Sequence, residues 1–169
     1  MKNIILLFLI LYFLLLFQTG FLNSFKFAPN FVLTTILITI IFEKRGKIFG
    51  LTSALLGGFL LDIFSGFNFG VSTLSLVLLY FCLKLLIKLF LKINILEFSF
   101  FIIFGTFFYS LFLSSFNYLS GLMFLSQSSV FQFNLNYSTL VEIGFNLGLG
   151  IIVFYLIKYH GIFRSLLLK

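Results

Sequence analysis

The stretch GKIFGLTSALLGGFLLDIFSGFNFG, residues 46–70, places small residues and one carboxylate at a regular spacing inside an apolar segment. The residues that lie four apart are Gly46, Gly50, Ala54, Gly58, Asp62, Gly66 and Gly70. On an α-helix, four residues advance about 40° beyond a full turn, so this row forms a slowly winding stripe. A neighbouring helix that crosses at a right-handed angle can follow such a stripe closely. The stretch therefore predicts a close-packed helix, around which the rest of the chain forms a bundle.

The composition of the 169-residue chain excludes an ordinary soluble domain, because 62% of its residues are apolar and its mean hydropathy is +1.24. The net charge of +7 would suit a nucleic-acid partner, but the basic residues flank apolar segments instead of forming a basic domain. The single cysteine, Cys82, excludes an internal disulfide and a metal-spaced cysteine pair. We therefore expect an integral membrane protein that contacts the lipid bilayer and binds no nucleic acid.

Six apolar segments are candidate membrane helices, which need about 20 residues to cross the hydrocarbon core. They cover residues 4–22, 28–42, 48–64, 69–90, 98–118 and 139–157. The longest polar connection, residues 120–138, separates the last two segments. We predict an all-α integral membrane protein with a single six-helix transmembrane domain over residues 1–169.

The basic residues predict the orientation of this bundle. With six spans, both termini and the second and fourth connections share one side, which holds ten of the eleven Lys and Arg residues. The opposite side has only Lys26. Since cytoplasmic connections are enriched in Lys and Arg, we expect both termini in the cytoplasm. Asp62 and Glu142 then lie near the outer ends of their helices.

Asp62 is the most informative single residue. A carboxylate in the membrane costs about 2.5 to 3.5 kcal/mol on insertion scales and usually faces the bundle interior or a wet cavity. One interpretation is a structural hydrogen-bond acceptor that holds the turn at Ser65 and Gly66 or a neighbouring helix end. The other is direct contact with a partner or ligand.

Glu142 and the glycines that follow it form a second group. We expect Glu142 in the first turn of the last span, where its charge stabilises the helix N-terminus. Gly144 and Gly148 form a GxxxG row, which predicts close packing because small residues let backbones approach. An acid–base pair would require Asp62 and Glu142 to lie side by side, which their shared outer depth permits.

Lys84, Lys88 and Lys92 lie four apart at the cytoplasmic end of the fourth span. They either reach towards anionic lipid headgroups or bind an acidic cytoplasmic partner. His160 is solitary and near the C-terminus, which is typical of a solvated or interfacial residue.

The sequence holds no phosphate-binding glycine loop with Lys, no GxSxG, no HExxH and no cluster of His or Cys at ligand spacing. We therefore expect no enzymatic activity, no cofactor and no metal. The nine residues that we assign to helix packing or partner binding are Gly50, Ala54, Gly58, Asp62, Gly66, Gly70, Glu142, Gly144 and Gly148.

Several short motifs, taken in order, resemble a known family. They are Phe17-Gln18-Thr19 late in the first span, Pro29-Asn30 opening the second, Gly58-Phe59-Leu60-Leu61-Asp62 between Gly46 and Gly70, and Leu74 beyond. This order resembles the MreD family of bacterial rod-shape-determining membrane proteins. The resemblance covers about the first half of the chain, and the second half is similar in hydropathy and length only. The family often carries Asp after the proline, where this chain has Asn30.

The resemblance implies a non-enzymatic component of the cell-wall elongation machinery, in the bacterial inner membrane, that maintains rod cell shape. It implies direct contact with MreC, and direct or indirect contact with the actin homologue MreB and the glycan-synthesising complex. Spans three and six, or the connection 120–138, are the surfaces that we expect to face MreC.

The family is similar in its six-helix fold to the substrate-binding S-component of energy-coupling-factor transporters, which gives the alternative function. An S-component would bind a vitamin or a metal in an outward-facing cavity and dock through small residues of the first span. Here the first span is rich in Leu and Phe, has Gly20 alone and has no Ala-xxx-Ala row, which disfavours a transporter.

Overall fold

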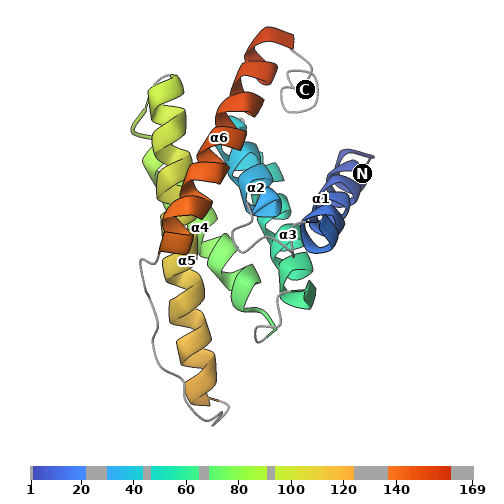
Figure 1. Ribbon diagram of the computed structural model, residues 1–169, viewed down its shortest axis with the longest axis vertical. Helices are drawn as coiled ribbons and strands as arrows, with labels where there is room; N and C mark the ends of the chain where they lie inside the picture. Colours follow the sequence, from blue (N-terminus) through green and yellow to red (C-terminus); the bar gives the residue numbers. More distant parts are fainter. Residues whose placement is uncertain are drawn as a thin grey trace.

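The computed structural model describes residues 2–21, 30–43, 47–64, 69–90, 94–123 and 137–160, and its regular structure over these ranges is entirely α-helical (Figure 1). The helices are α1 (Lys2–Phe21), α2 (Phe31–Phe42), α3 (Phe49–Phe64), α4 (Val71–Ile87), α5 (Ile95–Met123) and α6 (Tyr137–His160). Over the described ranges, the prediction of an all-α protein with six helices is confirmed, and the prediction that all six cross a membrane is not.

The largest departure from the predicted bounds is in α5, which extends beyond residues 98–118 in both directions. It takes in the first residues of the expected polar connection, and α6 takes in the last two, while residues 124–136 lie outside the described part. The serines near the end of α5 donate to backbone carbonyls three or four residues back, as Ser114 and Ser120 do. Because the helix satisfies these hydroxyls itself, a polar composition does not end it.

Only two helices of the described ranges are long and apolar enough to cross a membrane by themselves, over Ile95–Gly121 and Thr139–Lys158. The twelve residues of α2 measure about 18 Å at 1.5 Å per residue, against a hydrocarbon core of about 30 Å. The helices α3 and α4 have 16 and 17 residues. By length and composition, α5 and α6 can therefore cross a membrane, and the other four predicted spans do not meet these criteria.

The shortest helix, α2, is the centre of the bundle. It contacts α1, α3, α4, α5 and α6, and nine of its twelve residues are buried. A helix that is surrounded on all sides is apolar all round, which is the pattern of FVLTTILITIIF. The hydroxyl groups of its threonines donate to backbone carbonyls within the chain, such as Thr34 to Asn30 and Thr39 to Ile36.

The small-residue row of α3 is buried against its neighbours, as the sequence predicts. A Cβ at Gly58 would lie 2.5 Å from the Cα of Thr73 in α4, and one at Gly50 would lie 3.1 Å from the ring of Tyr80. Ala54 between them is fully buried. Because a methyl group at Gly58 would meet backbone, only glycine permits this approach of α3 to α4.

One other described member of the row, Gly70, does not pack in this way. Gly70 precedes α4 with a φ of 95°, in the left-handed region that favours glycine, and a Cβ there would meet nothing within 4 Å. Its role is therefore conformational. Gly46 and Gly66 lie outside the described residues.

Of the two roles expected for Gly144 and Gly148, helix packing or partner binding, packing against the described helices of this chain is not what the structure shows. Both are exposed, and a Cβ at either position would meet no atom within 4 Å. The face of α6 that packs inward carries Asn146, Gly150 and Phe154, which are buried at a spacing of four residues. Gly144 and Gly148 are two residues out of step with this row, about 200° around the helix, so they face away from the bundle.

The two ends of the bundle differ in charge. The beginning of α1 and the end of α6 lie at the same end (Figure 1). The end of α2, the start of α3 and the end of α4 also meet there, since Glu43 contacts both Gly50 and Lys84. The described lysine side chains lie at this end, which we call the basic end: Lys47, Lys84, Lys88 and Lys158. The opposite end is called the pocket end.

Candidate functional site

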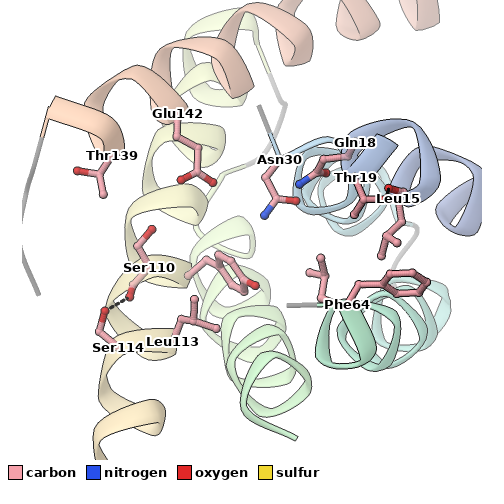
Figure 2. Close-up of a pocket in the computed structure, with 12 residues that line it drawn as sticks. Leu15, Gln18, Thr19, Asn30, Phe64, Ser110, Leu113, Ser114, Thr139 and Glu142 are labelled. Atoms are coloured by element: carbon pink, nitrogen blue, oxygen red, sulfur yellow. Dashed lines mark hydrogen bonds between the residues drawn. The ribbon is translucent and has the colours of Figure 1, made fainter. Parts of the chain in front are cut away.

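A pocket of about 380 Å³ lies at the pocket end, between α1, α3, α5 and α6 and beside Asn30 (Figure 2). One part of its wall is apolar and is formed by Leu15, Leu61, Phe64 and Leu113. The other part presents hydroxyl, amide and carboxylate groups, from Gln18, Thr19, Asn30, Tyr109, Ser110, Ser114, Thr139 and Glu142. The lining contains no Lys or Arg among the described residues.

The amide side chains of the pocket join three helices. The Oε1 of Gln18 in α1 accepts a hydrogen bond from the backbone N of Phe31, at 3.1 Å. Asn30 caps α2, because its Oδ1 accepts from the backbone N of Leu33 at 3.0 Å. The backbone N of Asn30 donates to the Oδ1 of Asn146 in α6, at 3.1 Å. This end of the bundle is therefore held by hydrogen bonds between α1, α2 and α6.

Asp62 lies beside the pocket wall and serves a neighbouring helix. Its Oδ1 accepts from the backbone N of Ser72 at 2.7 Å, and its Oδ2 accepts from the backbone N and the hydroxyl of Thr73 at 3.1 and 2.6 Å. These amides belong to the first turn of α4, whose N-cap residue, Gly70, has no side chain to cap the helix. The 5% exposed Asp62 thus acts as an N-cap supplied from α3. This geometry is that of the structural interpretation, a hydrogen-bond acceptor for a neighbouring helix end.

Glu142 has a different position from the one expected. Because α6 begins at Tyr137, Glu142 is its sixth residue, and the prediction that it lies in the first turn is wrong. Its side chain points into the pocket (Figure 2). No hydrogen bond or ion pair reaches its carboxylate from the part of the chain that the structure describes. Asp62 accepts its hydrogen bonds from α4, and none joins the two carboxylates in the part of the chain that the structure describes.

The basic end holds a buried ion pair between Glu43 and Lys84 that the sequence analysis does not predict. The side chain of Glu43 is 1% exposed and contacts the Nζ of Lys84 at 2.5 Å. Its Oε1 accepts from the backbone N of Gly50 at 2.5 Å, and its Oε2 accepts from the hydroxyl of Tyr80 at 3.4 Å. Glu43 therefore ties the end of α2 to the start of α3 and the end of α4.

This ion pair corrects the interpretation of the lysine row. Lys84 pairs with an internal carboxylate, that of Glu43, which was neither of the two expected roles. Lys88 is exposed. Lys92 and the side chain of His160 lie outside the part of the chain that the structure describes. The signal available in the sequence was the four-residue spacing of Tyr80 and Lys84, which places both on one face of α4. Nothing in that spacing indicates Glu43.

Over the described ranges, no group of three or more His, Cys, Asp or Glu side chains is placed to hold a metal ion. What the pocket offers is hydrogen bonding and one negative charge. The fold and the site together define an all-helical protein with two long apolar helices and a polar pocket at one end. Comparison of the chain with models of protein families, with curated protein sequences and with solved structures finds no match.

Proposed function

We propose that this chain is a multi-pass membrane protein of the MreD type, a non-enzymatic scaffold of the bacterial cell-wall elongation machinery that maintains rod shape through MreC. The observation that carries the proposal is the meeting of separate motifs at the pocket end. Gln18, Asn30 and Leu61, from three of the motifs on which the resemblance rests, line one pocket. These residues are far apart in the chain but form one pocket, which is expected if the motifs serve a common structural role.

The exposed surface of the helices supports a membrane location. Ile5, Leu9 and Phe13, four residues apart on one face of α1, are 56%, 54% and 69% exposed. A contiguous apolar face of this kind is unfavourable in water and is stable against lipid. The helices shorter than the hydrocarbon core span it where the bilayer thins, at a cost of a fraction of a kcal/mol per Å.

The charges support an orientation with six spans and both termini in the cytoplasm of the inner membrane. The basic end carries the described lysine side chains, and the lining of the pocket carries none. Under the rule that positive residues stay inside, the basic end faces the cytoplasm and the pocket faces outward. MreB and the glycan-synthesising complex then meet the protein at the basic end or through MreC.

The surface that we propose for MreC lies on α6. Gly144 and Gly148 leave a shallow strip on the outer face, which continues to the 58% exposed Ile152 and the 51% exposed Leu156. Small residues on a lipid-facing helix allow the backbone of a partner helix to approach closely. We assign this strip, Gly144, Gly148, Ile152 and Leu156, to the membrane helix of MreC.

Co-purification of MreC with the variant Gly148→Leu tests the assignment. A leucine there meets nothing within the chain, so the fold is kept while a partner helix is held away. Recovery of MreC is expected to fall at least fivefold, and Leu85→Ile, an apolar exchange on an exposed face of α4, is expected to leave it unchanged. Equal recovery with Gly148→Leu at equal expression removes this surface. Gly58→Leu is unsuitable, because it would separate α3 from α4.

The cellular function is tested by depletion in a rod-shaped host. The proposal predicts rounded cells, restored to rods by the wild-type chain. Normal rods after complete depletion contradict it.

The pocket favours a second candidate, the S-component of an energy-coupling-factor transporter. Its volume of about 380 Å³ falls at the lower end of the range of small-molecule sites. The large apolar side chains on the exposed face of α1 disfavour docking through small residues of that helix. Loss of vitamin uptake with unchanged cell shape after depletion is the result that supports this candidate over the first.

A further inference from the structure

We propose that the pocket binds a primary ammonium group, with the carboxylate of Glu142 as its counter-ion. The group belongs either to a small organic amine or to the ethanolamine headgroup of a lipid. This site goes beyond the proposed scaffold function and does not depend on MreC, since Glu142 and Gly148 lie on opposite faces of α6.

The first argument is the contrast between Glu142 and the other acidic residues of the chain, which has four. Glu43 pairs with Lys84, Asp62 caps α4, and Glu97 accepts from the backbone N of Asn94 at 2.9 Å. Glu142 alone receives no hydrogen bond or ion pair from the described residues, although its side chain is half-buried. A carboxylate that is half-buried without an internal partner loses part of its hydration, and a cation in the pocket would offset that cost.

The second argument is the chemistry of the remaining wall. The wall that carries Glu142 also carries the hydroxyl groups of Tyr109 and Ser110, whose oxygens can accept hydrogen bonds. An ammonium group has three N–H donors and needs acceptors alone, which matches one carboxylate with hydroxyl oxygens in the same wall. Leu61 and Phe64 give the carbon skeleton of the ligand an apolar surface. The wall provides no Lys or Arg in its described part, so an anion has no counterpart there.

The third argument is size. The pocket of about 380 Å³ holds about a dozen water molecules at about 30 Å³ each, which is more than a bare metal ion fills. A single carboxylate is also too few charged ligands for a dedicated divalent-cation site. An organic ammonium compound or a lipid headgroup fits both the volume and the charge.

The test uses the full chain reconstituted in phosphatidylcholine nanodiscs. In one arm, ethanolamine or choline is added at equal concentration and the thermal unfolding midpoint is followed by circular dichroism. In the other, native mass spectrometry measures how much phosphatidylethanolamine the protein retains from mixed bilayers. A bound ligand raises the midpoint, and choline carries the same charge without N–H donors.

The wild type is expected to respond to ethanolamine more than to choline, or to retain phosphatidylethanolamine over phosphatidylcholine; the arm that responds identifies the source. Glu142→Gln is expected to weaken the binding about tenfold or more, as loss of a charge-assisted hydrogen bond does. Glu97→Gln, at an exposed hydrogen bond outside the pocket, is expected to bind as the wild type does.

No preference for the primary amine in either arm overturns the proposal, and so does full retention of the preference in Glu142→Gln. Should Glu142→Gln fail to fold, the wild-type comparison of ethanolamine with choline decides alone. If the ammonium site fails this test, the proposed MreC surface is not contradicted. If Gly148→Leu does not reduce recovery of MreC, the proposed ammonium site is not contradicted.

Discussion

Glu43 at the basic end is buried and Glu142 at the pocket end is half-buried, and their surroundings are opposite. Glu43 is contacted by a lysine, a backbone amide and a tyrosine hydroxyl from two other segments. Glu142 faces a pocket and is contacted by no donor of the described residues. The difference shows how one residue type serves two purposes: a carboxylate with internal partners fastens helices together, and one without them is free for a ligand.

The largest effect is expected from Lys84→Met, which breaks the pair at the basic end. It leaves the buried Glu43 without its cation, and removing one partner of a buried ion pair costs about 3 to 5 kcal/mol. Equilibrium unfolding in mixed micelles of mild detergent and dodecyl sulfate measures the loss, with the exposed Lys88→Met as control. If the two variants unfold alike, the ion pair between Lys84 and Glu43 does not stabilise the fold.

Asp62→Ala is expected to cost about 2 to 3 kcal/mol, because it removes the acceptor of two amides and one hydroxyl at the start of α4. Asp62→Asn keeps one carbonyl oxygen and should lose about half as much. Hydrogen exchange at the amides of Ser72 and Thr73 locates the effect. Unchanged protection of these amides in the alanine variant would place the cap elsewhere.

The glycine rows of α3 and α6 can be compared in the same way, because Gly58 is packed against α4 and Gly148 faces open space. Gly58→Ala is expected to cost about 2 kcal/mol, because its methyl group meets the backbone of Thr73. Gly148→Ala meets open space and should gain up to about 1 kcal/mol from helix propensity. The same unfolding assay compares them, and a cost at Gly148 equal to that at Gly58 contradicts the assigned faces of α6.

The smallest effect on stability is expected from Glu142→Gln, with a loss below about 0.5 kcal/mol. No internal hydrogen bond is broken and the volume is kept. A loss similar to that of Lys84→Met would show that Glu142 has an internal partner, and the contrast between the two ends would disappear.

Much of the fold is predictable from the sequence, because hydropathy and the four-residue rows are local patterns. The six helices and the packing of Gly50, Ala54 and Gly58 follow from them. The bounds of α5 do not, since serines satisfied by their own helix look like a loop in composition. The predicted start of α6 at residue 139 is two residues late, so Glu142 is the sixth residue of the helix and not the fourth.

The sequence by itself determined the helical class, the apolar character of the chain and the positions at which small residues permit close contact. Tertiary structure decided which of these positions are used: Gly58 is packed and Gly148 is open, although both belong to similar rows. It also decided the partners of the carboxylates, joining Glu43 to Lys84 and Asp62 to Thr73. The reason is physical. Periodicity records neighbours on one helix, whereas an ion pair or a cap between helices depends on how the helices are rotated and placed against one another.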